Sequence, residues 1–407
     1  MPEDAFYIRR MWSFSRALDL SLVDEEIERG LQVALGQRHG ERVAYIAMRL
    51  GRNLGLNKKD LVHLTLAGLL HDIGALGCFR THYGNSKILN KHCLVGSAIV
   101  ERFPSGAILA PAIKYHHETP SPTRSALRVP ADEVPLMARI LSLADQVDLR
   151  LPRRRHTRQE RDEMLQWITR ENGILFYPEV TVAFEQVAEK EAFWLDIEQS
   201  DLLQIALELL FGKWHLPSVR ELETGFTDEL AATFADLIDQ KSQFTARHSR
   251  SVAETVEHLA SGLGWDEKQR HEIYVAGLLH DLGKLSIPKK ILDKQGPLDA
   301  SEVEVIRTHT YYTHRLLTEA GFPTQMVEWA AHHHERLDGR GYPFALTGKD
   351  VDVGARLMTI ADMFAALTED RPYRRAMSAG EALDIIQRGV GISVDAELVN
   401  LARQRLV

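Results

Sequence analysis

The sequence predicts an all-α protein built as two tandem helical bundles joined by a helical connector. First, apolar residues recur three and four positions apart in segments such as 23–35, 41–56 and 381–391, as on one face of a helix. Second, alternating strand patterns closed by Asn-Gly or Asp-Gly turns are nearly absent. Third, several segments of the first half recur in the second half after about 209 residues, a period too long for a solenoid.

The repeat defines the domain organisation. LAGLLHDIGALG (66–77) recurs as VAGLLHDLGKLS (275–286), AIKYHHE (112–118) as WAAHHHE (329–335), and ARILSLADQVDLRL (138–151) as ARLMTIADMFAALT (355–368). We therefore predict an N-terminal helical segment at 1–36, a first copy at 37–190, a packed helical connector at 191–245 and a second copy at 246–407.

Composition excludes several classes of protein. The 407 residues are 44% hydrophobic and 26% charged, which is typical of a soluble globular chain. A net charge of −8 argues against a DNA- or RNA-polymer binder, and two cysteines are too few for a disulfide framework or a Cys-ligated zinc site. No apolar run is long enough for a membrane span, and the first residues lack a signal-peptide pattern. We expect a cytoplasmic protein with no membrane contact.

Each copy carries five histidines and two aspartates suited to binding metal. The first set is His39, His71, Asp72, His92, His116, His117 and Asp145; the second is His248, His280, Asp281, His309, His333, His334 and Asp362. The first and second histidines are 32 positions apart in both sets, and the third and fourth are 24 apart. Seven ligands exceed the needs of one tetrahedral ion but suit two ions roughly 3.5–4 Å apart, which can activate water and clamp a phosphate. This pattern predicts phosphoester hydrolysis.

At HDLGK (280–284) and HHERLDGRGYP (333–343), the second copy resembles the HD-GYP family of cyclic-dinucleotide phosphodiesterases, over about 246–407. The resemblance implies an HD-superfamily helical bundle in each copy. It also implies hydrolysis of cyclic di-GMP to linear pGpG or GMP. The cofactors would be two divalent transition-metal ions per active site, iron or manganese, with nickel, cobalt or zinc as alternatives. Hydrolysis of 3',3'-cyclic GMP-AMP is the main alternative activity, and a general nucleotide phosphohydrolase is a weaker one.

The resemblance also implies individual residue functions. One ion would be held by His248, His280, Asp281 and Asp362, and the other by Asp281, His309, His333 and His334, so that Asp281 bridges them. Asp281 and Lys284 would be the catalytic residues. The substrate-binding residues would be Lys284, Arg371, Arg374 and Tyr342, because ammonium and guanidinium groups neutralise and grip phosphate. The GYP loop would form an active-site wall or contact a protein partner.

Two departures from the family bear on these expectations. Some members carry an acidic residue about one turn before the first histidine, which supports a third metal. Residues 241–247 contain none, which favours two ions over three. Ala365 stands where the family has a second aspartate, which weakens any contact that this aspartate makes to substrate or ligands.

The first copy keeps all seven ligand-type residues, and Asp148 at the place of Ala365, but Ala75 replaces the lysine and no GYP motif follows His116-His117. Three interpretations remain open: a sensor or dimerisation platform, a phosphomonoesterase acting on the linear product, or a metal-binding domain without turnover. The arginines at 150, 153, 154, 155, 158 and 161 form either a solvated helix end or an anion site. The expected partner is the cyclic dinucleotide substrate; a homodimer is left open.

Overall fold

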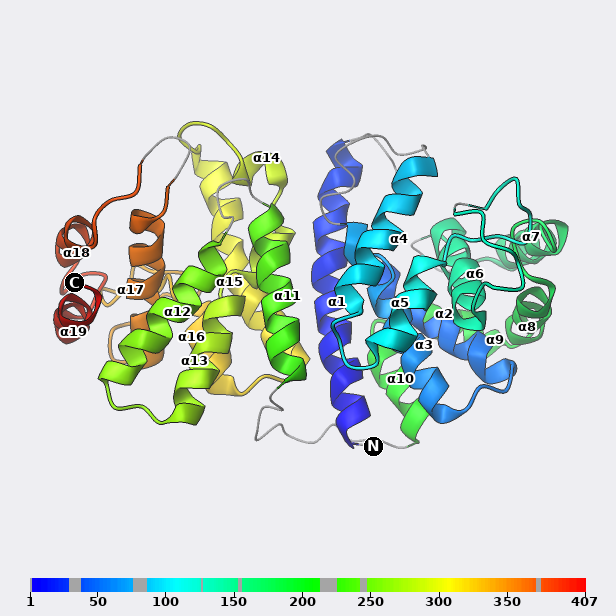
Figure 1. Cartoon of the computed structure of the whole chain (residues 1–407), viewed down its shortest axis with the longest axis horizontal. Helices are drawn as coiled ribbons and strands as arrows, with labels where there is room; N and C mark the ends of the chain where they lie inside the picture. Colours follow the sequence, from blue (N-terminus) through cyan, green and yellow to red (C-terminus); the bar gives the residue numbers. More distant parts are fainter. Residues whose placement is uncertain are drawn as a thin grey trace. The chain divides into compact units, whose positions relative to one another are not determined.

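The computed structural model describes residues 2–28, 38–75, 86–125, 127–152, 156–212, 225–241, 247–370 and 375–407. Within these ranges every regular element is a helix and no strand occurs, apart from isolated bridges (Figure 1). The predicted all-α class is therefore confirmed. The chain divides into two compact units, Met1–Pro217 and Ser218–Val407.

The first unit contains ten α-helices and one 3₁₀ turn in its described residues. They are α1 (Pro2–Glu28), α2 (His39–Asn53), α3 (Lys58–Leu70), η1 (Ile73–Ala75), α4 (Ser86–Val100), α5 (Gly106–Lys114), α6 (Leu136–Arg150), α7 (Arg158–Arg170), α8 (Pro178–Ala188), α9 (Glu191–Glu198) and α10 (Leu202–Phe211). Helices α2, α3, α5 and α6 pack on one another to form the centre of the bundle.

The second unit repeats this order. Its elements are α11 (Phe226–Lys241), α12 (His248–Gly262), α13 (Glu267–Leu279), η2 (Leu282–Ser286), α14 (Lys289–Leu292), α15 (Ala300–Ala320), α16 (Thr324–Ala331), α17 (Val353–Thr368), α18 (Ala379–Gln387) and α19 (Ala396–Leu406). Helices α12, α13, α15, α16 and α17 correspond to α2, α3, α4, α5 and α6, because they carry the repeated motifs at matching places.

Local sequence explains where several of these helices begin. Capping boxes start α13 at Asp266 and α15 at Asp299, where the cap side chain accepts a hydrogen bond from the backbone N–H three residues on. Helix α15 is terminated by Gly321, the residue after its last helical position, which has the left-handed φ of 78° that glycine adopts without steric cost. These signals fix the length of the helix that carries His309.

The helices before the first histidine of each set also correspond. Asp19 on α1 accepts hydrogen bonds from the backbone N–H of Gly40, and Asp239 on α11 accepts them from that of Ser249. Each carboxylate therefore satisfies a free N–H in the first turn of α2 or α12, directly after the first histidine. The structural repeat thus includes α1 and α11, which lie outside the predicted copies.

The predicted connector at 191–245 is shared between the units. Helices α9 and α10 pack against α2 in the first unit, whereas α11 packs against α12 and α13 in the second. Residues 213–224 and 242–246 of that stretch lie outside the described residues.

None of the helices described is both long enough and apolar enough to cross a lipid bilayer.

A glycine allows α12 and α13 to approach closely beside the second ligand set. A methyl group at Gly277 would lie 2.7 Å from the Cα of Ala253 on α12, and one at Gly68 in the first unit would lie 2.6 Å from the Cα of Ala44. Backbone atoms cannot retreat as a side chain can, so both helices would have to separate. The repeated AGLLHD sequence therefore encodes a helix crossing as well as two ligands.

We predict that Gly277→Ala destabilises the protein by about 1–3 kcal/mol, the usual cost of overpacking. Gly380→Ala is the matched control, because a methyl group at Gly380 on α18 meets nothing within 4 Å. Alanine is also favoured over glycine inside a helix, so this control should be neutral or stabilising. Denaturant unfolding of both variants measures the difference. Equal unfolding free energies would contradict the close helix crossing.

Candidate metal centres

The His-Asp pair of the second unit lies at a sharp transition from α13 to η2. Helix α13 ends at Leu279, and Leu282–Ser286 continue as a 3₁₀ turn. A side chain at Gly283 would overlap the backbone carbonyl of His309, so only glycine lets η2 pack this closely on α15. Thr313 joins the two elements, since its hydroxyl donates to the His280 carbonyl at 3.0 Å and accepts from the Gly283 N–H at 2.9 Å. The turn thus brings Asp281 next to α15.

Three imidazoles of the second unit are oriented by their own helices. The Nδ1 atoms donate to carbonyl oxygens three residues earlier: His280 to Gly277 at 2.8 Å, His309 to Ile306 at 2.6 Å and His333 to Ala330 at 2.7 Å. A carbonyl oxygen only accepts, so Nδ1 carries the hydrogen and Nε2 keeps its lone pair in the neutral ring. Each ring is therefore prepared to bind a metal through Nε2.

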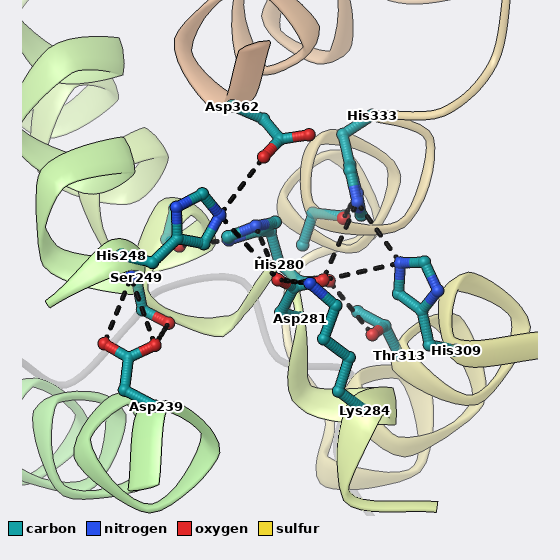
Figure 2. A network of polar contacts seen from close by, with 12 residues as sticks. Asp239, His248, Ser249, His280, Asp281, Lys284, His309, Thr313, His333 and Asp362 are labelled. Carbon is teal, nitrogen blue, oxygen red and sulfur yellow. Dashed lines mark hydrogen bonds and ion pairs between the residues drawn. The ribbon is translucent and has the colours of Figure 1, made fainter. Parts of the chain in front are cut away.

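Asp281 lies at the centre of these rings, with its two oxygens facing different histidines (Figure 2). Its Oδ2 is 3.2 Å from His280 Nε2 and 4.0 Å from His248 Nε2. Its Oδ1 is 3.4 Å from His309 Nε2 and 3.9 Å from His333 Nε2. One carboxylate therefore faces two separate groups of ligand atoms, which is the geometry that a bridging ligand between two ions requires.

His248 begins α12 and is held between two carboxylates. Its Nε2 is 3.2 Å from Asp362 Oδ1, and its Nδ1 is 3.3 Å from Glu369 Oε2. Burial would lower the pKa of His248, but the hydrogen bonds to Asp362 and Glu369 raise it to about 9. An ion bound at Nε2 would have to displace the proton there, which couples metal binding to proton release.

Glu369 supplies the carboxylate that Ala365 cannot provide to the first histidine of the second unit. In the first unit, Asp148 accepts from His39 Nδ1 at 2.7 Å and also binds Arg42. In the second unit, Ala365 occupies the matching position, and Glu369, one helical turn further on, binds the corresponding nitrogen of His248. The sequence comparison missed this substitution because the two carboxylates occupy different positions of the repeat.

The titration behaviour of the cluster matches a metal site. Burial by itself would raise the pKa of Asp281, but His280 and Lys284 outweigh it and hold that pKa well below its usual range. Burial lowers the pKa of His309 to about 3 and places the pKa of His333 well below normal. Ionised carboxylates and neutral imidazoles are the forms that bind a divalent cation.

The residues present fit such a cation. Among the described side chains, two buried atoms at the centre of the cluster have no hydrogen-bond partner, namely His280 Nε2 and Asp281 Oδ1. Leaving buried polar atoms unpaired is costly. Their positions between neutral imidazoles and ionised carboxylates suit a positive ion. Two of the three-residue groups able to hold an ion in this unit are His248 with His280 and Asp281, and His309 with His333 and His334.

The predicted substrate-binding residues fall partly within the described region. The Lys284 ammonium contacts Asp281 Oδ2, so it lies directly at the cluster (Figure 2). The Tyr342 ring lies 4.9 Å from that of His334, measured between centroids. Arg307, which the sequence analysis missed, places its guanidinium carbon 5.1 Å from the centre of the Tyr342 ring. Arg371 and Arg374 lie outside the described residues.

Asp239 contacts the residue next to His248, although residues 241–247 contain no carboxylate. It lies on α11, two residues before that window, and also accepts from the Ser249 hydroxyl at 2.9 Å. Burial raises its pKa to about 6. Its oxygens bind the first turn of α12, away from Asp281 (Figure 2). The sequence did not predict this contact, because Asp239 lies on a separate helix, outside the residues directly before His248.

The first unit assembles its predicted ligands in the same way. Asp72 Oδ2 is 3.4 Å from His71 Nε2 and 3.6 Å from His39 Nε2, whereas Oδ1 is 3.4 Å from His92 Nε2. His39 Nε2 is also 3.3 Å from Asp145 Oδ1. The structure thus brings a two-sided carboxylate and its histidines together in both copies.

Two details are particular to the first unit. The Cys93 thiol is 3.7 Å from nitrogens of both His92 and His116, and it belongs to the group His92, Cys93, His116 and His117 that could hold an ion. The sequence analysis did not include Cys93 among the candidate ligands, although its position directly after His92 could have indicated it. Among the arginines that follow Asp148, Arg150 lies over the Trp167 ring and Arg161 pairs with Glu191, while 153–155 lie outside the described residues.

A glutamate after each histidine pair anchors the loop that follows. Glu335 accepts from the backbone N–H groups of Phe344 at 2.7 Å and Leu346 at 2.9 Å. Glu118 accepts in the same way from Leu127 at 2.6 Å and Val129 at 3.3 Å. The two units therefore hold different loops through the same glutamate contacts. The repeated HHE sequence marks this glutamate but does not predict its hydrogen bonds to the loop.

Known proteins share this organisation. HD-domain family models match residues 37–150 and 232–398. The chain is 34% identical to 3'3'-cGAMP-specific phosphodiesterase 1 of Vibrio cholerae serotype O1, over 86% of this chain and 83% of that protein. It is 33% identical to a cyclic di-GMP phosphodiesterase of Thermotoga maritima, over 40% of this chain and 45% of that protein.

A crystal structure of a cyclic GMP-AMP specific phosphodiesterase of V. cholerae matches with a TM-score of 0.67 and 24% identity, over 98% of this chain and 97% of that one, which supports the fold. The long match to a curated relative, the two HD domains and the DGRGYP loop (338–343) after the second histidine pair agree with one another. The chain therefore belongs to the HD-GYP family of cyclic-dinucleotide phosphodiesterases, with an additional HD domain that lacks the GYP motif.

Proposed function

We propose that the second unit hydrolyses a phosphodiester bond of 3',3'-cyclic GMP-AMP through a dinuclear metal centre. The observation that carries the chemistry is the two-sided carboxylate of Asp281, with the imidazole of His280 facing one oxygen and that of His309 facing the other. The support for this substrate is the length of the matches. The cGAMP-specific relative aligns over 86% of this chain, across both units, whereas the T. maritima cyclic di-GMP enzyme aligns over 40%.

Each residue of the centre has a defined task in this proposal. His248, His280 and Asp362 would hold one ion, His309, His333 and His334 the other, and Asp281 both. Such ions supply an activated water and neutralise phosphate charge when bound. Lys284, 25% exposed at the edge of the cluster, can turn from Asp281 towards a phosphate oxygen, since its ammonium sits on a flexible stem.

The Tyr342 ring and the Arg307 guanidinium form the side wall of this centre. Tyr342 packs on His334, and Arg307 is exposed beside the ring. A flat aromatic face next to a cation suits a nucleobase joined to a phosphate. Cyclic di-GMP is the second candidate substrate, because Tyr342 belongs to the GYP loop that defines the whole family, and the T. maritima relative is named for that activity.

Asp281→Ala should abolish hydrolysis of both cyclic dinucleotides, because the clamp for both ions is lost. Metal analysis should show less metal per chain than in the wild type. The control is Asp384→Ala, which removes an exposed aspartate paired with Arg403 on the surface. Product analysis on cyclic GMP-AMP and cyclic di-GMP, with the wild type alongside, identifies the preferred substrate. Turnover by Asp281→Ala at the wild-type rate would refute the proposed centre.

Lys284→Ala should lower the turnover number by about 10² or more while both ions stay bound, as expected for the loss of one electrostatic stabiliser. Lys290→Ala provides the matched control, because Lys290 is an exposed lysine six residues away. The measurements are the turnover number and the metal content of each variant. A collapse of metal content in Lys284→Ala would show that the lysine maintains the cluster instead of serving the substrate.

We propose that the first unit binds metal and acts on the linear product as a phosphomonoesterase. The supporting observation is that Asp72 faces His39 and His71 with one oxygen and His92 with the other, as Asp281 does in the second unit. Ala75 stands at the place of Lys284, and the sequence after His116-His117 has no GYP motif that could form a wall for a cyclic dinucleotide. A regulatory nucleotide- or metal-binding module is the alternative, with the same ligands.

The double variant His71→Ala plus Asp72→Ala should leave ring opening of the cyclic dinucleotide nearly unchanged. It should instead stop release of inorganic phosphate from the linear product, because the first-unit metal would be lost. Time-resolved product analysis separates the two steps. Unchanged phosphate release together with altered ring opening would favour the regulatory alternative over the phosphomonoesterase.

A further inference from the structure

A cavity of about 350 Å³ lies beside the metal ligands of the first unit. Its lining residues are His117, Thr119, Thr123, Arg124, Ser125, Arg128, Ser142, Gln146, Leu175 and Phe176. They come from the loop after the histidine pair, from α6 and from the turn before α8. The volume is near the small end of the range for small-molecule sites, roughly 300–1,000 Å³. One nucleotide suits this space better than the two nucleotides of a cyclic substrate.

The cavity is continuous with the candidate metal centre. His117, one of the predicted ligands, forms part of its wall. Gln146, another wall residue, donates from Nε2 to Asp145 Oδ2 at 3.2 Å. In the second unit, the ring of Tyr342 lies against His334, the counterpart of His117. The two units therefore differ at this wall: the GYP tyrosine covers one histidine, and a cavity adjoins the other.

The charge of the cavity is positive. Its ten lining residues include two arginines and neither aspartate nor glutamate. Arg124 pairs with Glu171 at 3.1 Å. Within the described residues, the guanidinium of Arg128 has no hydrogen-bond or ion-pair partner. A free cation in a cavity next to a metal centre attracts an anionic group, and guanidinium binds phosphate oxygens in a fork geometry.

The loop holds Arg128 in place. Its backbone N–H donates to the Ser125 hydroxyl at 3.0 Å, and its φ is 60°, in the left-handed region. Glu118 binds the Ser125 hydroxyl and the N–H groups of residues on either side of Arg128, at Leu127 and Val129. The backbone from which the Arg128 side chain extends is thus held by a hydrogen-bonded loop. Leu175 and Phe176 give the cavity one apolar wall that a base or sugar can contact.

We infer that this cavity binds a nucleoside phosphomonoester, with the phosphate between Arg128 and the ligands of the first-unit centre and the nucleoside against Leu175 and Phe176. This inference rests on the proposed first-unit function and names the part of the linear product that the cavity takes: the terminal nucleotide unit that carries the phosphomonoester, for which GMP serves as the probe. It also explains the absence of a GYP tyrosine from the sequence after His117. A ring placed against His117 as Tyr342 is placed against His334 would occupy the space that the nucleotide needs.

The test is calorimetric titration of the full-length, metal-loaded protein with GMP, which needs no turnover. The wild type should bind GMP at two sites, one in each unit. Arg128→Gln should weaken one of these sites by at least about tenfold, the usual effect of losing a charged hydrogen bond. Arg170→Gln is the matched control, because Arg170 in the same unit is exposed and outside the cavity; it should leave both sites unchanged.

A second variant acts by filling space instead of removing charge. Thr123 is an exposed wall residue, so Thr123→Trp should block the cavity without disturbing the core, and it should weaken the same GMP site. Guanosine, which lacks the phosphate, should bind that site at least about tenfold more weakly than GMP. Unchanged GMP binding in both variants, or guanosine binding as tight as GMP at this site, would overturn the inference.

The same variants separate this inference from the function proposed for the second unit. Ring opening of the cyclic dinucleotide depends on Asp281 and Lys284, so Arg128→Gln and Thr123→Trp should leave its rate unchanged. Failure of the Asp281→Ala prediction would therefore remove the second-unit assignment and leave the GMP titration intact. Loss of the GMP effect alone would remove only the cavity assignment.

Discussion

Each unit is arranged around one central aspartate whose two oxygens face different histidines. For Asp281 these are His280 on one side and His309 on the other. This geometry requires a helix to end directly before the His-Asp pair and a second helix to pass close by. The small residues of the repeated motif permit both, since Gly277 allows the helix crossing and Gly283 lets η2 pack on α15. The two-sided carboxylate and the packing of the bundle are therefore one structural requirement.

The histidines would not serve as ligands without partners for their second nitrogen. His280, His309 and His333 use carbonyl oxygens of their own helices, which fixes each ring with Nε2 available. His39 and His248 begin their helices, and a carboxylate binds the Nδ1 atom of each ring: Asp148 in one unit and Glu369 in the other. The two units thus bind the same ring nitrogen with carboxylates that stand four residues apart in the repeat.

The all-α class and the gathering of the repeated histidines and aspartates could be predicted from sequence, because ligands that hold one centre keep their spacing when a domain is duplicated. Contacts between separate elements could not. Asp19 precedes His39 by 20 residues and Asp239 precedes His248 by 9, yet both bind the first turn of the following ligand helix. Arg307 likewise meets Tyr342 only because α15 and the GYP loop adjoin. The number of residues between two positions does not predict such contacts.

The two units show how one framework can support two different sites. Glu118 and Glu335 anchor the loops after the histidine pairs, and Arg139 and Arg356 bind carbonyl groups of the same loops from the next helix, at Val134 and Val351. The residues that hold the loop are thus separate from those that form the wall. A loop can then exchange an aromatic wall for a cationic cavity without disturbing the histidine cluster, because neither the central aspartate nor the contacts between imidazoles and helix carbonyls depend on the loop interior. The wall, more than the metal ligands, would then decide which phosphate ester each centre accepts.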